Sequence, residues 1–322
     1  MRLLGVSMVR NEADVVEAFV RHNLTVLDAL VIVDHGSIDG TSEILAKLQA
    51  EGLPLQVVPN ADPAYRQSAT MTALTRDALA QDNADFVFAL DADEFLKLEG
   101  RATLERALSE VPAGVHAVLH WLTYVPDAFD GDPGAFGPGH LWWRLKTERH
   151  GLFKVVVSRG LLERPDDTVA MGNHCVQSPS ETSVRPHARL RQDVAVLAHC
   201  PVRSRSQLEG KIIVGYLAYL ATQPKDHRRA RHWGELYAEL RAGASLSEQR
   251  LREIACNYGL PTKMWQSPTT TEFVEDPVAL HFERRYQSDV APDPRSLLMR
   301  FTETLIAAAQ QSASVAPADS AP

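Results

Sequence analysis

Apolar runs and helical spacings alternate along roughly the first hundred residues. Short apolar runs predict strands, and between them apolar residues recur at the spacing of an amphipathic helix. Asn11 offers a helix N-cap, with acidic residues in the turn that follows it. The predicted strands cover residues 3–8, 29–33, 55–58 and 86–90, and the predicted helices cover 15–24, 44–48 and 66–80.

Strands that alternate with helices indicate an α/β fold built on a mainly parallel sheet flanked by helices. Because parallel strands end at one edge of such a sheet, residues after different strands meet there and form the usual ligand crevice. Three polar segments follow predicted strands, namely residues 7–12, 34–41 and 91–94. We therefore expect these three segments to share one site.

The pattern is less regular after Gly100. Residues 118–125, 152–157 and 194–197 predict further strands, and Ser206 with Glu209 resembles a capping box that opens an apolar helix. The chain then becomes helical and more polar, and its Ala/Ser/Pro-rich end predicts disorder. The predicted organisation is a catalytic domain over 1–222, a helical extension over 223–311 and a disordered tail over 312–322.

Three carboxylates follow the apolar run at 86–90, namely Asp91, Asp93 and Glu94. Carboxylates are not buried side by side without a compensating cation, so this strand end predicts a divalent metal, Mg²⁺ or Mn²⁺. The alternative is an acidic loop that binds nothing. A second Asp-X-Asp, at Asp130 and Asp132, lies in a Gly/Pro-rich segment and is explained by a solvated turn.

The segment after the second predicted strand contains no Gly-X-Gly-X-X-Gly dinucleotide fingerprint. Asp34 nevertheless ends its strand as an acidic residue that can accept hydrogen bonds from a nucleobase or a ribose. Gly36 permits a tight turn close to a ligand. Ser37, Asp39 and Thr41 are equally explained as turn and cap residues.

Composition narrows the function classes. The 322 residues are 45% hydrophobic and 23% charged, as in globular proteins, and the net charge of −8 argues against a general nucleic-acid binder. Three cysteines favour a reducing compartment, and no segment resembles a signal peptide or a membrane span. We expect a cytoplasmic protein, for which peripheral membrane contact remains open.

Three segments together carry a resemblance to a known family. Residues 9–13 (VRNEA), 33–41 (VDHGSIDGT) and 90–95 (LDADEF) resemble the successive nucleotide and metal motifs of family 2 type glycosyltransferases. They are most similar to a subgroup with an Asn-Glu-Ala opening and an Asp-X-Asp-Glu-Phe metal motif. Later positions resemble this subgroup more weakly: Gly172, His174, His199, Ser204, Ser206, Lys211 and Gly215.

The resemblance implies a GT-A fold that binds a nucleoside-diphosphate sugar, with a UDP-sugar as the expected donor and inversion as the expected outcome. It implies that the Val6–Ser7 backbone and Asp34 hold the base and ribose. It also implies a Mn²⁺ or Mg²⁺ ion on Asp93, with Asp91 directly or through water, completed by His199 or His174. The implied donor-binding residues are Val6, Ser7, Asn11, Glu12, Asp34, Gly36, Ser37, Asp39 and Asp91.

Two further features of the site remain open. The pairs His174-Cys175 and His199-Cys200 suggest zinc, but adjacent side chains on an extended chain point to opposite faces. An inverting transferase also needs a carboxylate base. Asp127 follows the aromatic strand and is the candidate base, with Asp130 and Asp132 as competitors. Trp121, Trp142 and Trp143 either stack on an acceptor sugar or pack in the core.

Three hypotheses follow. The first is a metal-dependent glycosyltransferase whose acceptor is a glycan or another hydroxyl compound. The second is another phosphate enzyme, but a nucleotidyltransferase would carry a Gly-rich basic loop after its first strand, and an aspartate-dependent phosphatase would carry its Asp-X-Asp there. The third is a non-catalytic protein that binds a sugar nucleotide.

Overall fold

The computed structural model describes residues 1–129, 136–149, 152–178, 184–222, 231–280, 282–287 and 293–315. The strands and helices predicted up to Leu90 are all present. The structure adds β5, which the sequence analysis did not predict. The first eight elements are β1 (Leu3–Val9), α1 (Val16–Asn23), β2 (Ala29–Asp34), α2 (Thr41–Ala50), β3 (Leu55–Pro59), α3 (Gln67–Ala80), β4 (Phe86–Leu90) and β5 (Glu94–Leu98).

The rest of the chain continues the sheet and then becomes helical. Its strands are β6 (His116–Thr123), β7 (Trp143–Leu145), β8 (Phe153–Ser158), β9 (Thr168–Val169), β10 (Val176–Gln177), β11 (His187–Arg189), β12 (Ala195–His199) and β13 (Phe273–Glu275). Its α-helices are α4 (Arg101–Ser109), α5 (Arg205–Leu220), α6 (Arg231–Arg241), α7 (Glu248–Cys256) and α8 (Pro294–Val315). Short 3-10 turns are η1 (Pro138–Leu141), η2 (Arg159–Leu161), η3 (Thr262–Met264) and η4 (Pro268–Thr270).

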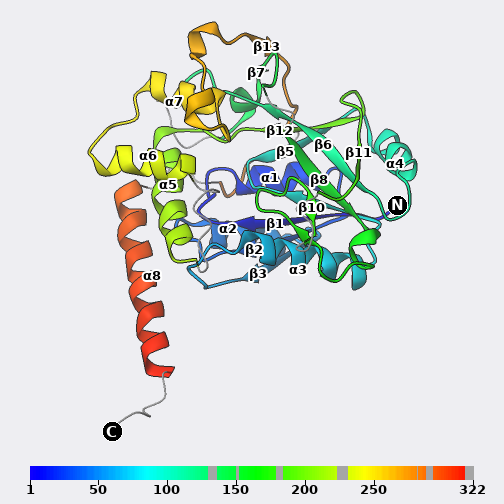
Figure 1. Ribbon diagram of the computed structural model, residues 1–322, viewed down its shortest axis with the longest axis horizontal. Coiled ribbons are helices and arrows are strands. Elements are labelled where there is room, and N and C mark those ends of the chain that lie inside the picture. Colours follow the sequence, from blue (N-terminus) through cyan, green and yellow to red (C-terminus); the bar gives the residue numbers. More distant parts are fainter. Residues whose placement is uncertain are drawn as a thin grey trace.

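A large sheet forms the centre of the molecule (Figure 1). Its strand order is β3-β2-β1-β4-β8-β6-β12-β5, and β11 pairs with β6. Strands β1 to β4 are mutually parallel, as are β6, β11 and β12, whereas β8 and β5 run antiparallel to their neighbours. The prediction of an α/β fold with a mainly parallel sheet flanked by helices is confirmed.

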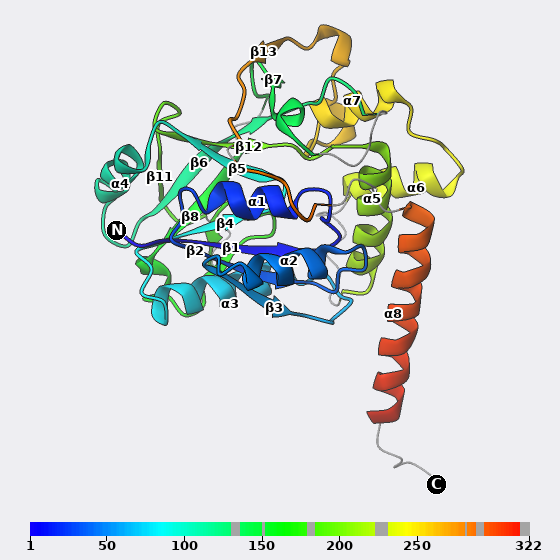
Figure 2. The same ribbon diagram turned by 180° about the vertical axis from the view of Figure 1, so that it is seen from behind.

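Helices cover both faces of this sheet (Figures 1 and 2). On one face, Phe19 of α1 and Leu45 of α2 are buried in the same core as Phe88. On the other face, Met71 and Leu79 of α3 pack in the core that contains Val6 and its neighbours. Side chains alternate between these two cores along β1 and β4, which explains why both strands are continuous apolar runs.

Helices α5, α6 and α7 form a third core beside the carboxyl ends of the strands. Helix α8 packs on α5 through Leu297 and Phe301, and its later turns extend away from the body (Figure 2). It continues to Val315, past the predicted boundary at residue 311. Within the described part of the chain, no helix is both long and apolar enough to cross a lipid bilayer.

The predicted helix cap at Asn11 is wrong. Helix α1 begins at Val16, and Asn11 instead adopts a left-handed conformation with φ of +58°. Its Oδ1 accepts a hydrogen bond from Ile38 N at 2.8 Å, and its own N–H donates to Ser37 Oγ at 3.0 Å. Asn11 therefore joins the loop after β1 to the loop after β2, because a short side-chain amide both tolerates this backbone and reaches the neighbouring loop.

The predicted capping box of α5 is displaced by two residues. Ser204, not Ser206, caps the helix by accepting a hydrogen bond from Gln207 N at 3.2 Å. The Gln207 side chain accepts one from Arg203 N at 3.0 Å. The cap therefore fixes the backbone of Arg203, which precedes the helix.

We expect Asn11→Ala to lower the free energy of unfolding by about 2–3 kcal/mol, because it strains a left-handed backbone and removes a partly buried hydrogen bond. Asn83→Ala is the matched control, since Asn83 is exposed and has φ of +54°. It should cost about 1 kcal/mol from backbone strain alone. Urea unfolding measures both, and equal losses would show that the bond between the loops contributes nothing.

Candidate functional site

The loops after β1, β2, β4 and β12 meet at one edge of the sheet, on the side of α5. Strand pairing sets their spacing, since Val9 lies opposite Asp34 and Ser7 lies opposite Leu90. Adjacent strands are about 4.8 Å apart, so the ends of β2 and β4 are separated by about 10 Å, with β1 between them. Segments 34–41 and 91–94 therefore lie on either side of segment 7–12 along this edge.

The first two loops are held together by their own polar side chains. Asp34 accepts hydrogen bonds from Ser37 N at 3.0 Å and from the Ser42 hydroxyl. Asp39 accepts from Ala13 N at 2.9 Å, and Thr41 Oγ1 accepts from Glu12 N at the same distance. These contacts explain the folded shape of both loops, and Gly36, with φ of +63°, makes a turn within the loop after β2.

Asp93 is buried beside a lysine, an arginine and a histidine. Its Oδ2 lies 2.6 Å from Lys211 Nζ and 3.7 Å from Arg203 Nη1, and its Oδ1 lies 3.4 Å from His199 Nε2. Burial alone would raise the pKa of Asp93, but the charges of these neighbours hold it well below its usual range. Asp93 is therefore ionised throughout the neutral range.

Arg203 links Asp93 to the loop after β1. Its guanidinium donates to both Asp14 oxygens, at 2.5 and 2.9 Å, and to Glu12 Oε2 at 2.5 Å. Burial raises the pKa of Glu12 to about 7 in spite of Arg203 and Lys211. The buried guanidinium of Arg203 therefore compensates part of the charge of three carboxylates, those of Glu12, Asp14 and Asp93.

Asp91 is held by a second set of partners. Its Oδ1 accepts from the amides of Gln67 and Asn173 at 3.2 and 3.1 Å, and its Oδ2 lies 2.5 Å from Lys154 Nζ. The same ammonium lies 2.8 Å from Glu94 Oε1. Burial raises the pKa of Glu94 to about 8, although the positive charge of Lys154 acts to lower it. Lys154 reaches this edge because β8 runs antiparallel to β4.

We call these residues the charged cluster. Its described members are five carboxylates and three cations, so negative charge is in excess: Glu12, Asp14, Asp91, Asp93, Glu94, Lys154, Arg203 and Lys211. Burial is the main cause of the raised pKa values of Glu12 and Glu94, and the neighbouring carboxylates raise them further. A bound divalent cation would relieve the excess of negative charge.

Asp93 and His199 have donor atoms suited to such a cation. Two neighbouring ligands of an octahedral ion at about 2.1 Å lie about 3 Å apart, close to the 3.4 Å between Asp93 Oδ1 and His199 Nε2. Burial lowers the pKa of His199, which keeps the imidazole neutral and able to coordinate. Among the described residues, no three His, Cys, Asp or Glu side chains are placed to hold one metal.

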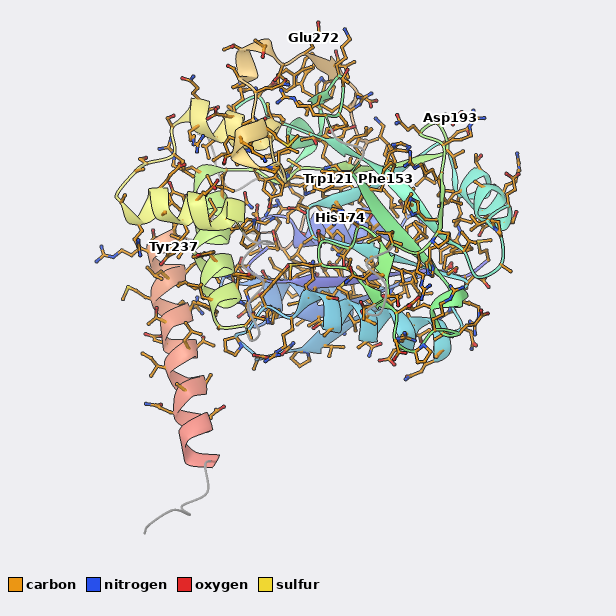
Figure 3. All side chains as sticks on the ribbon, viewed as in Figure 1. Trp121, Phe153, His174, Asp193, Tyr237 and Glu272 are labelled. Carbon is orange, nitrogen blue, oxygen red and sulfur yellow. The ribbon has the colours of Figure 1, made fainter. Side chains whose placement is uncertain are left out.

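Aromatic rings lie beside the cluster: Lys154 Nζ is 5.8 Å from the centroid of the Trp121 ring, and Figure 3 shows Trp121 close to His174. The Trp121 ring meets His199 edge-on at a centroid distance of 4.0 Å and stacks on His174 at 5.9 Å. His174 Nδ1 lies 2.8 Å from Phe153 O, and burial lowers its pKa to about 4. His199, not His174, is the histidine in contact with Asp93.

Several buried polar atoms at this edge have no hydrogen-bond partner among the described residues. They include Ser7 Oγ, Trp121 Nε1, Asn173 Oδ1 and His199 Nδ1. Buried polar groups are almost always paired in folded proteins. Their clustering beside the charged residues is typical of a site that a ligand or water completes.

The remaining sequence candidates are placed as follows. Val6 is buried in β1, and Asp127 is exposed on the loop after β6, where its carbonyl accepts a hydrogen bond from Arg252. Asp130 and Asp132 lie outside the described residues. Trp142 is exposed and Trp143 half-buried, both away from the contacts of the charged cluster described above.

Asp14 and Gln67 were not predicted as site residues, and neither were three others from later in the chain. Lys154 is a lone lysine in an otherwise apolar strand, and that position was the available signal. Arg203 follows β12 without any distinguishing motif. Tyr258 comes from the loop after α7, and its ring lies 5.6 Å from that of His199. Only the folded chain brings Arg203 and Tyr258 to Asp93 and His199.

Comparisons with known proteins give weak likenesses. No protein-family model matches the chain, and no curated protein matches it. Among solved structures, it is similar to the mannosyltransferase PcManGT from Pyrobaculum calidifontis in complex with GDP-Man and Mn²⁺. The identity is 18% over 74% of this chain and 69% of the mannosyltransferase, with a TM-score of 0.38.

Two further likenesses are weaker. Glucosyl-3-phosphoglycerate synthase from Mycobacterium tuberculosis, in complex with Mn²⁺, UDP and glucosyl-3-phosphoglycerate, aligns over 37% of this chain and 43% of its own, at 23% identity and a TM-score of 0.25. Mannose-1-phosphate geranyltransferase from Thermus thermophilus aligns over 81% of this chain and 68% of its own, at 13% identity and a TM-score of 0.27. TM-scores this low establish no function for the chain.

The charged cluster makes a prediction about stability. Lys154→Met leaves the buried Glu94 and the half-buried Asp91 without their cation, and we expect it to lower the free energy of unfolding by about 3–5 kcal/mol. Lys146→Met is the control, because the Lys146–Glu272 pair is exposed, and it should cost about 1 kcal/mol or less. Urea unfolding of both variants tests this.

The same measurement on the double variant Lys154→Met/Glu94→Gln shows whether Glu94 contributes. The double variant should be more stable than Lys154→Met, because the introduced glutamine side chain carries no charge to leave uncompensated. Equal unfolding free energies for Lys154→Met and Lys146→Met would contradict the assignment of Lys154 as the cation of this pair.

Proposed function

We propose that this chain is a metal-dependent glycosyltransferase of the GT-A type, which transfers a sugar from a nucleoside-diphosphate donor to an acceptor hydroxyl. The observation that carries the proposal is the pairing of Asp93 with His199 at the sheet edge where the loops after β1 and β2 also end. Open α/β sheets bind ligands at this edge.

The nucleoside would occupy the end of the edge formed by β1 and β2. Asp34 would accept hydrogen bonds from the base or ribose. Asn11, Ser37 and Asp39 join the two loops beside it. Val6 and Ser7 pair with β2 and β4, so their backbone groups are engaged in the sheet. The spacing of about 10 Å from β2 to β4 suits a nucleoside at Asp34 and a diphosphate near Asp93. A UDP-sugar remains the expected donor.

A Mn²⁺ or Mg²⁺ ion would be held by Asp93 Oδ1 and His199 Nε2. Such ions in phosphate sites usually take one or two carboxylates and complete their shell with phosphate oxygens and water. When bound, the ion stabilises the charge that develops on the leaving diphosphate. Both oxygens of Asp91 already have partners, so we assign Asp91 to the donor sugar or to a metal-bound water.

The three cations of the cluster would assist the same leaving group. Lys211, with 21% of its side chain exposed, lies on Asp93, whereas Lys154 and Arg203 are almost fully buried. The buried pair keeps the carboxylates in place. Lys211 is the cation free to turn toward a diphosphate oxygen, where its charge would favour departure.

In the transfer step, the acceptor oxygen attacks the anomeric carbon while the bond from that carbon to the phosphate oxygen breaks. The nucleoside diphosphate leaves with the electron pair, and the acceptor proton passes to a carboxylate. Asp127 is our candidate base. Arg252 of α7 binds its carbonyl, so the loop that carries Asp127 is anchored to the helices beside the site.

The test is the affinity for nucleoside diphosphates, measured by calorimetry with UDP and GDP in Mn²⁺ and in EDTA. We expect one nucleotide to bind, with at least tenfold loss of affinity in EDTA, in Asp93→Asn and in His199→Gln. Ten-fold corresponds to about 1.4 kcal/mol. Asp193→Asn is the control, because Asp193 is exposed on a loop remote from Trp121 and His174 (Figure 3).

Thermal melts confirm that each variant is folded before its affinity is read. Unchanged nucleotide affinity in folded Asp93→Asn would reject the metal assignment. Turnover separates the rival enzyme class: a glycosyltransferase releases nucleoside diphosphate from a sugar nucleotide, whereas pyrophosphate release from a nucleoside triphosphate and a sugar phosphate would identify a nucleotidyltransferase.

A further inference from the structure

A carboxylate outside the charged cluster lies at the end of β6. Glu148 Oε1 accepts a hydrogen bond from Thr123 N at 2.5 Å, and its Oε2 accepts one from Thr123 Oγ1 at 2.9 Å. Trp121 N donates to Leu152 O, and Thr123 N, two residues later, points to the same side, beyond the first residue of β8. Glu148 therefore takes the place of a strand partner at this point.

The position of Thr123 in the sheet brings Glu148 to the candidate site. Thr123 pairs with His199 of β12 and lies two residues after Trp121, so its side chain is on the same face of β6 as the Trp121 ring. That ring meets His199 edge-on at a centroid distance of 4.0 Å and lies 5.8 Å from Lys154 Nζ. Because Cα atoms of paired strands are about 5 Å apart, the Glu148 carboxylate lies within about 10 Å of the His199 backbone.

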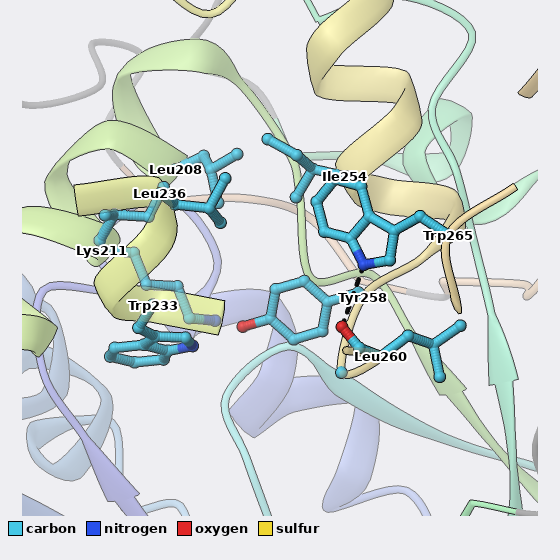
Figure 4. A pocket seen from close by; sticks show the side chains of 10 residues that line it. Leu208, Lys211, Trp233, Leu236, Ile254, Tyr258, Leu260 and Trp265 are labelled. Atoms are coloured by element: carbon cyan, nitrogen blue, oxygen red, sulfur yellow. Dashed lines mark hydrogen bonds between the residues drawn. The ribbon is translucent and has the colours of Figure 1, made fainter. Parts of the chain in front are cut away.

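The loop after α7 covers the same region. The Tyr258 ring lies 5.6 Å from that of His199, and Figure 4 shows the Tyr258 side chain pointing toward Lys211. The next residue, Gly259, is in van der Waals range of the Trp121 ring, since a Cβ placed there would lie 4.0 Å from it. This loop therefore borders His199 and Trp121 together.

The segment that carries Glu148 is anchored to that loop. Arg149 Nη1 donates to Asn257 Oδ1 and its Nη2 to Thr271 Oγ1, both at 2.7 Å. The Glu148 side chain itself is half-buried, so one part of it remains accessible. Its carboxylate is thus held in place by Thr123 and by the neighbouring backbone.

Glu148 belongs to none of the ion pairs within the described part of the chain. Arg144 pairs with Asp276 at 2.6 Å, and Arg149 is engaged as described above. Burial raises the pKa of the Glu148 carboxyl, although Thr123 and both arginines act to lower it. Each carboxylate of the charged cluster, by contrast, is engaged by a lysine or an arginine. A carboxylate without an ion pair is the better proton acceptor.

The contacts of Asp127 differ from those of Glu148. Asp127 is exposed, four residues beyond Thr123, and its backbone carbonyl binds Arg252 in the middle of α7. This contact does not bring the Asp127 carboxylate toward His199. In Glu148 the carboxylate itself makes the contact at the end of β6.

We propose that Glu148, in place of Asp127, is the general base that activates the acceptor hydroxyl. The inference rests on the proposed glycosyltransferase function. The acceptor O–H gives its proton to a Glu148 oxygen as the acceptor oxygen bonds to the anomeric carbon. The bond from that carbon to the phosphate oxygen breaks, and the nucleoside diphosphate leaves with the electron pair. Thr123 is a positioning residue, whose hydroxyl holds the carboxylate.

Hydrolysis of the donor tests this assignment without a known acceptor, because water can take the place of the acceptor hydroxyl. UDP-glucose and GDP-mannose with Mn²⁺ are the probes, and released UDP or GDP is measured. Glu148→Gln should lower kcat by about a hundredfold or more and leave KM and the calorimetric affinity for the nucleoside diphosphate unchanged. Glu148→Asp should recover part of the lost kcat, because it restores a carboxylate.

Two further variants complete the set. Glu272→Gln is the control and should leave kcat unchanged, since Glu272 is exposed in its pair with Lys146. Thr123→Val removes the hydroxyl and keeps the N–H, and it should lower kcat by about tenfold, the effect of one hydrogen bond to a charged group. Thr123→Val decides the question if Glu148→Gln does not fold by thermal melt.

The outcomes separate this inference from the proposed function. Wild-type kcat in folded Glu148→Gln, or a larger loss of kcat in Asp127→Asn than in Glu148→Gln, would overturn the inference and keep the transferase. Binding of a sugar nucleotide without any hydrolysis by the wild type would also overturn it. Binding of neither sugar nucleotide would reject the transferase, and the base assignment with it.

Discussion

The burial of carboxylates with too few cations is the constraint on which this site depends. Asp93 is ionised because Lys211 and Arg203 lie against it, while burial raises the pKa of Glu12 to about 7 and of Glu94 to about 8. An arrangement of this kind is costly for stability, since desolvation opposes every charge in it. Under the proposed function, this arrangement would be prepared for a bound cation and a polyanionic ligand.

The order of strands in the sheet builds this arrangement from distant segments. Parallel β1, β2 and β4 bring their carboxyl ends together, and antiparallel β8 returns Lys154 to the same edge. Strand β5 pairs with β12 so that Glu94 lies opposite His199, which places Asp93 beside the imidazole. Helix α5 begins after its cap Ser204 and presents Lys211 about two turns later.

Much of this architecture could be predicted from local patterns. The apolar run from Phe86 to Leu90 and the spacing of α1 to α3 identified the parallel half of the sheet, and strand ends alone indicated where Asp91 and Asp93 would lie. Local patterns failed where a contact spans a long sequence distance. Asn11 looks like a helix cap, and only the neighbouring loop, with Ile38, explains its left-handed backbone.

The cations were harder to predict than the acids for the same reason. Three carboxylates in four positions form a motif, whereas Arg203 is an isolated residue whose three carboxylate partners lie about 110 to 190 positions earlier in the chain. Strand β5 was missed because an acidic motif at its start hid the short apolar stretch behind it. The antiparallel course of β8 depends on pairing, which periodicity does not encode.

Lys211 contacts both the charged cluster and the apolar wall formed by α5, α6 and α7, and this has a consequence for binding. Its ammonium forms an ion pair with Asp93, and its hydrocarbon stem is part of the apolar wall. A ligand that draws the ammonium away from Asp93 also reshapes that wall. The affinity of that ligand and the packing of this wall would then be coupled, so that a substitution in the wall changes the affinity without touching the ligand.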